Sequence, residues 1–206
     1  MYGLRKIEKD GKNFYNNFVW PLEVGAEVET PDWNPEPFCG GGLHCLPNAI
    51  GNWDLLHGHY WAVLEFDKKD MVLIDSEKCK VKKCKIIFLS KSRKGMIKFF
   101  DYEKFDSETA CFWVAKIGNK DIMIDRITES EWAYWWALVM GNQDIMIDRI
   151  TNSEDAYYWA RFIGNRNKMI NRITEPKWAF EWIRNVGNRK EMIARFPDIV
   201  DRWKYI

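Results

Sequence analysis

The sequence lacks several features that define common classes of protein. No apolar run approaches the ~20 residues that a membrane-spanning helix needs, and the opening residues, MYGLRKIEKDGK, lack the apolar segment of a signal peptide. The 31 basic and 30 acidic residues nearly cancel, so the basic excess of proteins that coat duplex DNA is also missing. We therefore expect a cytoplasmic protein with no membrane partner, for which nucleic acid is disfavoured as a ligand.

Cysteine is scarce and odd in number. Five cysteines in a chain without an export signal fit free thiols in a reducing compartment better than a disulfide framework. Hydrophobic residues make up 47% of the chain and aromatic residues 16%, which is enough to fill a packed core. The composition thus predicts a folded protein of one or two compact domains.

What the sequence does contain is an internal repeat. Residues of five types recur four times at a constant spacing of 23 residues: Gly118, Gly141, Gly164 and Gly187; Ala110, Ala133, Ala156 and Ala179; Trp113, Trp136, Trp159 and Trp182; Met123, Met146, Met169 and Met192; Arg126, Arg149, Arg172 and Arg195. One unit of this length cannot enclose a core, but stacked units share one. The repeat therefore predicts an α-solenoid of four two-helix repeats over residues 104–206.

Each repeat fits a long helix followed by a short one. In the second repeat the apolar residues fall on one helical stripe, at Ala133, Trp136, Ala137 and Met140. Two capping boxes predict where long helices begin: Thr128 with Glu131, and Thr151 with Glu154. Gly141 supplies a left-handed residue that ends the long helix, and Asn142 is a candidate cap for the short helix.

The repeating tryptophans are best explained as a core ladder, because repeat proteins fill their stacked cores in this way. The Arg126 series follows Asp125, Asp148 and Asn171, and it fits ion pairs between repeats better than a ladder of anion sites.

Function in solenoids is expected where the repeats differ. The variable helix positions carry four aromatic residues, interrupted by Asp155 and Glu181: Trp132, Trp135, Tyr158 and Trp178. Aromatic residues beyond the core stripe are typical of interface cores, although extra packing between repeats explains them equally well. We expect these four residues to bind a partner.

The first hundred residues follow a different pattern. Four segments predict strands, YGLRKI, YWAVLEF, MVLID and KCKVKKCKIIFL, and DKKD and SEK are expected turns. We place a boundary near residue 100. The expected architecture is α+β, with a small antiparallel-sheet domain over residues 1–100 and the helical repeat domain over 104–206.

A stretch rich in proline, tryptophan and glycine, residues 33–61, is too irregular for long helices, and such loops often line sites. Its candidate pocket residues are Cys39, Gly42, His44, Trp53, His57 and His59. Cys39, His44, Cys45, His57 and His59 are ligand types that suit zinc, but their spacing matches no standard site, and buried thiols and loop histidines explain them better. GGGL lacks the phosphate-loop patterns, and no spacing supports a Cys–His nucleophile pair. No catalytic residue, metal or cofactor is expected.

The run from Lys78 to Lys98 contains nine basic residues and no acid. Clustered cations could hold nucleic acid by releasing counterions. An exposed sheet edge guarded by lysines explains the run better, because no aromatic residue interleaves with the lysines before Phe88.

The stretch CGGGLHCLPNAIGNW, followed by YWAVLEF, a short acidic strand and VKKCKIIFLS, resembles an N-terminal domain of unknown function in phage and bacterial proteins. The likeness covers roughly residues 1–100 and centres on Gly42, Leu43 and His44. It implies a phage setting rather than a mechanism. The GGLH turn is also similar to a segment of ADP-ribosyltransferases, with Tyr2 and Gly3 as a first-strand match. That family's catalytic glutamate has no clear counterpart, and Glu65 matches by position only.

We therefore expect a non-enzymatic protein-binding protein. The resemblance implies a phage-encoded inhibitor, for anti-defence or host takeover, that engages a host or defence-system protein through the helical repeats in the cytoplasm of a bacterial cell. Self-association is also open. The alternative is a nucleotide-binding or diverged ADP-ribosyltransferase-like N-terminal domain. A third hypothesis is a nucleic-acid binder that uses the strand from Lys78 to Lys98.

Overall fold

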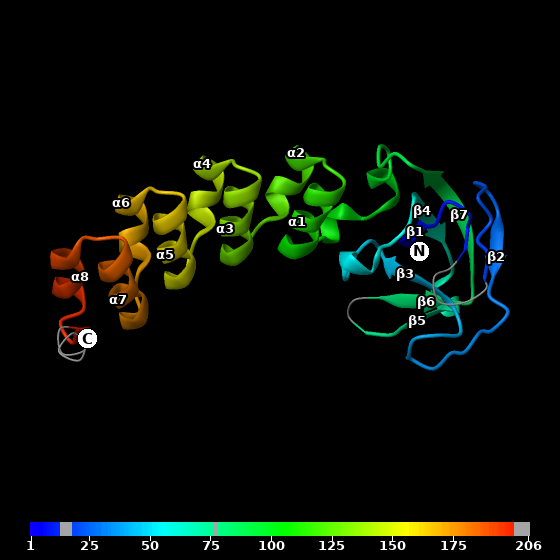
Figure 1. Cartoon of the computed structure of the whole chain (residues 1–206), viewed down its shortest axis with the longest axis horizontal. Helices are drawn as coiled ribbons and strands as arrows, with labels where there is room; N and C mark the ends of the chain where they lie inside the picture. Colours follow the sequence, from blue (N-terminus) through cyan, green and yellow to red (C-terminus); the bar gives the residue numbers. More distant parts are fainter. Residues whose placement is uncertain (13–17, 76–77, 200–206) are drawn as a thin grey trace. The chain divides into compact units, whose positions relative to one another are not determined.

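The computed structural model describes residues 1–12, 18–75 and 78–199. The predicted α+β architecture is confirmed: an antiparallel sheet is followed by helices that recur with the sequence repeat and pack sequentially (Figure 1). The chain divides into two compact units, Met1–Arg126 and Ile127–Ile206. The first helical repeat thus belongs to the same unit as the sheet.

Seven strands form one curled antiparallel sheet in the order β2-β7-β4-β1-β3-β6-β5. The strands are β1 (Tyr2–Ile7), β2 (Glu27–Glu29), β3 (Leu43–Pro47), β4 (Tyr60–Glu65), β5 (Met71–Leu73), β6 (Cys79–Val81) and β7 (Lys83–Ser90). All four segments predicted as strands contain strands, although the segment at 78–89 holds two, β6 and β7. Sequence patterns missed two strands. β2 is short and polar, and β3 is short and follows a glycine-rich stretch.

The core of the sheet unit follows from the alternation of side chains along its strands. Ile7, Leu64 and Ile86, from three neighbouring strands, share one buried cluster with Trp20. Gly3 lies on the same side of β1 as Ile7, and a Cβ there would lie 2.5 Å from the Cys45 sulfur. Glycine is therefore required where β1 packs so closely on β3. Short 3-10 turns connect the strands and lead to the repeats: η1 (Trp53–Leu55), η2 (Lys68–Asp70), η3 (Ile97–Phe99) and η4 (Tyr102–Lys104).

The predicted long and short helices are confirmed in every repeat. The long helices are α1 (Ser107–Lys116), α3 (Ser130–Val139), α5 (Ser153–Phe162) and α7 (Pro176–Asn185). The short helices are α2 (Lys120–Met123), α4 (Gln143–Met146), α6 (Arg166–Met169) and α8 (Arg189–Arg195), and η5 (Ile124–Arg126), η6 (Ile147–Arg149) and η7 (Ile170–Arg172) extend the first three. The invariant alanine, tryptophan and methionine side chains are 0% exposed in all four repeats. The recurring residues are therefore the shared core.

The turn between the two helices of a repeat needs two successive left-handed residues. The four repeat glycines have φ between 84° and 122°, and the asparagines that follow them have φ between 52° and 65°. A Cβ on Gly164 would meet nothing within 4 Å, so the dihedral angle rather than space requires glycine. Asn142 precedes α4 in this left-handed conformation and does not cap that helix with its side chain.

The predicted capping boxes are wrong by one residue. The N-cap of α5 is Asn152, whose Oδ1 accepts a hydrogen bond from the Asp155 amide at 2.8 Å, and the N-cap of α3 is Glu129. Thr151 lies before the cap because its amide donates to Ser130 Oγ of the preceding repeat at 3.1 Å. A contact between repeats therefore sets where the helix begins.

Polar groups link neighbouring repeats. The Ser153 hydroxyl accepts hydrogen bonds from the amides of Thr174 and Glu175, at 2.9 and 3.3 Å. The repeating arginines donate to carbonyls at the end of the preceding repeat, at 2.6 Å for Arg149 to Ile127, Arg172 to Ile150 and Arg195 to Ile173. Arg172 also lies 3.6 Å from Asp148. Carbonyl oxygens are therefore partners of three repeating arginines, and the Arg172–Asp148 contact is an ion pair between repeats of the kind that the sequence predicts.

None of the helices that the structure describes is both long enough and apolar enough to cross a membrane.

Candidate functional site

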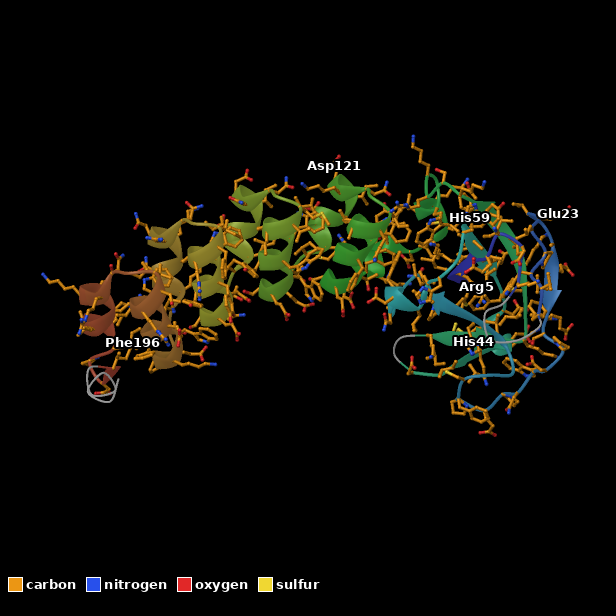
Figure 2. All side chains as sticks on the ribbon, in the orientation of Figure 1. Arg5, Glu23, His44, His59, Asp121 and Phe196 are labelled. Carbon is orange, nitrogen blue, oxygen red and sulfur yellow. The ribbon has the colours of Figure 1, made fainter. Side chains whose placement is uncertain are left out.

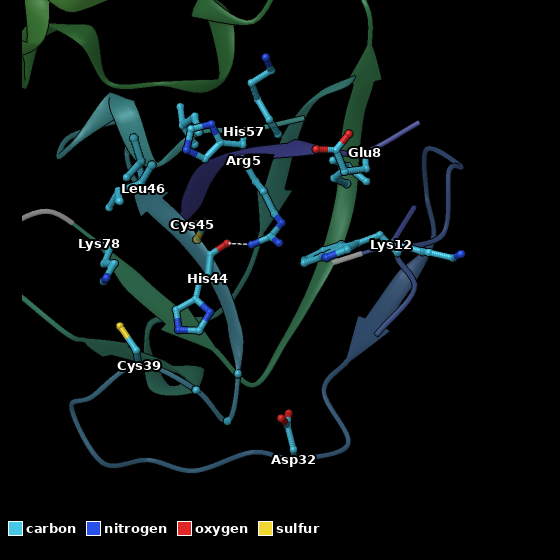
Figure 3. Close-up of a pocket in the computed structure, with 18 residues that line it drawn as sticks. Arg5, Glu8, Lys12, Asp32, Cys39, His44, Cys45, Leu46, His57 and Lys78 are labelled. Atoms are coloured by element: carbon cyan, nitrogen blue, oxygen red, sulfur yellow. Dashed lines mark hydrogen bonds between the residues drawn. The ribbon is translucent and has the colours of Figure 1, made fainter. Parts of the chain in front are cut away.

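The N-terminal unit contains a pocket of about 970 Å³ beside β1 and β3 (Figure 3). Its lining includes four basic residues, Arg5, Lys6, Lys12 and Lys78, and two acidic residues, Glu8 and Asp32. Apolar side chains and the glycine loop at residues 39–42 complete the lining. The pocket therefore combines an excess of positive charge with apolar surface.

The structure brings together four of the six predicted pocket residues. Cys39, Gly42, His44 and His57 line this pocket. Trp53 instead is buried with its ring centroid 5.7 Å from that of Trp113. His59 is exposed and packs edge-to-face on Tyr60 at 4.9 Å. The sequence grouped these residues as one loop, whereas β3 begins at Leu43 and carries His44 into the sheet.

Arg5 is the pocket residue that sequence patterns missed. It lies on β1 within the curled sheet (Figure 2). Its Nη1 donates a hydrogen bond to the His44 carbonyl (Figure 3), and its Cζ lies 4.6 Å from the centre of the Trp20 ring. Its Nε is buried and has no hydrogen-bond partner among the described residues. Burial lowers the pKa of Arg5 to about 10.

The adjacency of Arg5 and Lys6 was the available signal. Neighbouring residues of a strand point to opposite faces, so one of these two cations has to face the interior of the sheet. The sequence alone did not indicate which face is interior, because the pairing of β1 with β3 and β4 decides it.

His44 is a second pocket residue with a buried nitrogen that lacks a hydrogen-bond partner. Its Nε2 is buried and has no partner among the described residues. Burial, followed by the charges of Arg5, Lys78 and Lys80, lowers the pKa of His44 to about 4, although Asp32 opposes this shift. The imidazole is therefore neutral at neutral pH.

Lys80 fixes the glycine loop beside the pocket. This side chain on β6 is 0% exposed, and its Nζ donates to the carbonyls of Phe38 and Gly40, each at 2.9 Å. A Cβ on Gly42 would lie 3.0 Å from the Lys80 Cβ, so glycine leaves room for the lysine stem. A buried cation thus holds the loop through carbonyl oxygens.

The buried thiols are poor nucleophiles. Cys45 and Cys79 face each other across β3 and β6 with their sulfurs 3.5 Å apart. Their hydrogen bond and burial raise the pKa of Cys45 well above its usual value, and burial raises the pKa of Cys84 to about 12. In the described part of the chain, no group of three or more His, Cys, Asp and Glu side chains is placed to hold a metal ion.

Of the residues of the ADP-ribosyltransferase resemblance, Gly42 and His44 line the pocket, but the glutamate matched by position does not. Glu65 is exposed at the end of β4, where it pairs with Tyr2. Neither residue lines the pocket that holds His44, as far as the described residues show.

The basic run from Lys78 to Lys98 does not form a sheet edge, and the expectation of a lysine-guarded edge is therefore wrong. The edge strands are β2 and β5, whereas β6 and β7 each have neighbours on both sides. Glu27 and Glu29 of β2 lie opposite Lys85 and Lys83 of β7. Local composition could not reveal this, because the edge position depends on pairing with a distant acidic strand.

The four aromatic residues predicted to bind a partner pack on one another to different extents. Trp178 is buried, whereas Trp132, Trp135 and Tyr158 are half-buried. The Trp132 and Trp135 rings lie 6.2 Å apart within α3, and Tyr158 lies 5.7 Å from Trp178 across two repeats. These residues form contacts between repeats as well as part of the surface.

The same face of the long helices carries exposed apolar side chains. Leu138 and Val139 end α3 with 51% and 55% of their surface exposed, and Phe162 ends α5 with 56% exposed. Phe162 stacks on Tyr158 with ring centroids 6.2 Å apart, and the Arg161 guanidinium lies 5.1 Å from the centre of its ring. An apolar surface bordered by a cation therefore follows α3 and α5.

No protein-family model, curated protein or solved structure matches the chain.

Proposed function

We propose that the chain is a non-enzymatic binding protein that holds a partner protein on one face of its long helices. We name this face the variable stripe. It consists of the third, sixth, ninth and tenth residues of α3, α5 and α7: Trp132, Trp135, Leu138, Val139, Asp155, Tyr158, Arg161, Phe162, Trp178, Glu181, Arg184 and Asn185. Residues at this spacing lie on one side of a helix.

The observation that carries the proposal is the contrast between invariant and variable positions. Of the residues that recur in every repeat, the alanines, tryptophans and methionines are fully buried, and stacking accounts for them. The variable stripe is aromatic and apolar in α3 but mainly polar in α7. A side chain that only fills the stack has no reason to differ in this way, whereas recognition of one partner requires such differences.

The chemistry of the stripe indicates the kind of partner. Half-buried aromatic residues and exposed aliphatic ones are the side chains that anchor interface cores. Arg161 and Arg184 add exposed cations at the ends of α5 and α7. Of the two carboxylates of the stripe, Asp155 is buried and Glu181 accepts a hydrogen bond from Asn185 at 2.9 Å. A partner surface with apolar side chains flanked by carboxylates would complement both features.

The narrower expectation is an inhibitor made by a phage and directed at a host or defence-system protein. It rests on the resemblance of residues 1–100 and remains a prediction.

A pair of matched variants tests the proposal. Leu138→Glu with Phe162→Glu places two negative charges on the variable stripe. Gln143→Glu with Asn167→Glu places the same charges at exposed positions on the short helices of the same two repeats. Wild-type and variant proteins would serve as baits in bacterial lysate, with bound proteins quantified by mass spectrometry and the folds compared by thermal melting.

We expect one protein to be retained by wild type and by the short-helix variant, and to fall roughly tenfold or more with the stripe variant. Equal retention by both variants would contradict the proposal. Sedimentation velocity provides a second measurement. A dimer that the stripe variant disrupts would show that a second copy of this chain binds the variable stripe, and it would rule out a foreign partner for this face.

A further inference from the structure

We propose that the pocket of the N-terminal unit binds a small organic anion, with its oxyanion group at Arg5 and its apolar body on the lining. This inference concerns the sheet unit and is independent of the partner proposed for the long helices. Phosphate esters and carboxylates share the relevant chemistry.

The first argument is a cation without a counter-charge: Arg5 is half-buried, and its Nε is fully buried. Arg5 forms no ion pair with any carboxylate of the described residues, and its Nε lacks a hydrogen-bond partner there. The Arg5 guanidinium contacts the Trp20 ring and donates a hydrogen bond to the His44 carbonyl. Desolvating a cation without a counter-charge opposes folding. A bound anion would offset this unfavourable free energy.

The second argument is the charge around Arg5. Lys12 and Lys78 line the pocket with Arg5, against the carboxylates Glu8 and Asp32. Lys6 lies on the opposite face of β1, with its Nζ 5.0 Å from the centre of the Trp61 ring. A guanidinium is well matched to carboxylate and phosphate oxygens, because its donors are planar and their hydrogen bonds are charge-assisted. The Nε2 of neutral His44 has no hydrogen-bond partner among the described residues and supplies another polar contact for a ligand.

The third argument is the size and lining of the pocket. A volume of about 970 Å³ lies at the upper end of the range of small-molecule sites and far exceeds the size of an inorganic ion. Leu55 and Leu56 contribute apolar surface. The ligand therefore combines an oxyanion with an apolar body.

A purely structural role for Arg5 makes the opposite prediction about stability. If Arg5 serves only to anchor the His44 carbonyl, Arg5→Met should lower the melting temperature of the ligand-free protein. If Arg5 carries an uncompensated charge that serves a ligand, replacing it with the uncharged methionine should raise the melting temperature, because the uncompensated charge is removed.

The histidines provide a direct readout in the unmodified chain. The protein has three of them, of which His44 and His57 line the pocket and His59 does not. Their Cε1–Hε1 NMR signals would be followed while phenyl phosphate, benzoate or the uncharged benzyl alcohol is added. The charges that act on His44 in the free protein are Arg5, Lys78, Lys80 and Asp32, so a bound anion should add to the effect of Asp32 and raise the pKa of His44.

We expect one or both anions to shift the signals of His44 and His57 while His59 stays unchanged. A response to phenyl phosphate alone identifies a phosphate ester, and a response to benzoate alone identifies a carboxylate. No shift with either anion, equal shifts with benzyl alcohol, or equal shifts of all three histidines would each overturn the proposal.

Variants complete the test. Arg5→Met should weaken binding of the active anion roughly ten- to hundredfold, as expected for loss of a hydrogen bond to a charged group. Arg166→Met, at an exposed position of α6, should change neither binding nor the melting temperature. Unchanged anion binding by the Arg5 variant, or a lower melting temperature of its ligand-free form, would show that Arg5 is structural and would contradict the inference.

Discussion

The helical repeats and the curled sheet differ in which buried polar groups have partners and which do not. In the repeats, several polar side chains form hydrogen bonds with a neighbouring repeat. Ser153 accepts hydrogen bonds from two amides of the next repeat, and Arg172 donates one to a carbonyl of the previous repeat. In the sheet unit, Lys80 is satisfied by two carbonyls, but Arg5 and His44 retain buried nitrogens without partners among the described residues. In the repeats, the buried atoms without partners are the indole nitrogens of Trp136, Trp159 and Trp182 and the Oδ1 of Asn142. The sheet unit differs because two basic side chains with such atoms line one pocket.

The largest effect should come from the tryptophan ladder. Trp136 is 0% exposed, so Trp136→Ala should leave a cavity and lower the free energy of unfolding by about 3 to 5 kcal/mol. Trp135→Ala, one residue away in α3 and half-buried, is the matched control and should cost clearly less. Urea unfolding of both variants measures the difference, and equal losses would show that invariance does not mark the core.

A smaller effect should come from the serine that links repeats. Ser153→Ala removes the acceptor of the Thr174 and Glu175 amides and should lower the free energy of unfolding by about 1 to 2 kcal/mol. Ser92→Ala, in an exposed loop, should change it by less than about 0.5 kcal/mol. If the two variants unfold alike, the hydroxyl does not couple the repeats.

A separate effect should appear on acidification and should involve the sheet unit. The pKa of His44 is about 4 in the fold against an ordinary value of 6.5, so the unfolded chain binds the proton more readily. The contribution of neutral His44 is fully present above about pH 6.5 and is lost as the pH falls towards 4. His44→Gln cannot titrate, so its unfolding free energy should decline less over this interval.

The histidine prediction is checked by thermal melts of both proteins at matched pH values. His59→Gln, at an exposed position outside the pocket, is the control and should follow wild type. Parallel declines of wild type and His44→Gln would exclude a titrating group at His44.

The sequence predicted the repeats well because their determinants are local and recur. The spacing of Trp136 and Gly141, for example, gives both the buried face of the long helix and its end. The helix starts were misplaced because the Thr151 amide is held by Ser130 of the previous repeat, a contact that no local motif contains.

The sheet unit was harder to predict because its features depend on pairing between distant segments. β3 lies in a glycine-rich stretch without alternation, and β2 is only 3 residues long. Arg5 becomes a pocket residue only when β1 pairs with β3, and Lys83 loses its expected edge position only when β2 pairs with β7. The histidines of the pocket were identified by residue type, whereas the central cation was not.

The central claim is that the variable stripe, and not the invariant core, contacts the partner. Fluorine NMR of chains labelled with 5-fluorotryptophan tests it most directly, because the 12 tryptophans include both classes. Addition of the captured partner should shift the signals of Trp132 and Trp135 and leave those of Trp136 and Trp159 in place. Unchanged signals from Trp132 and Trp135, with shifts confined to tryptophans of the N-terminal unit such as Trp20 and Trp33, would contradict the account.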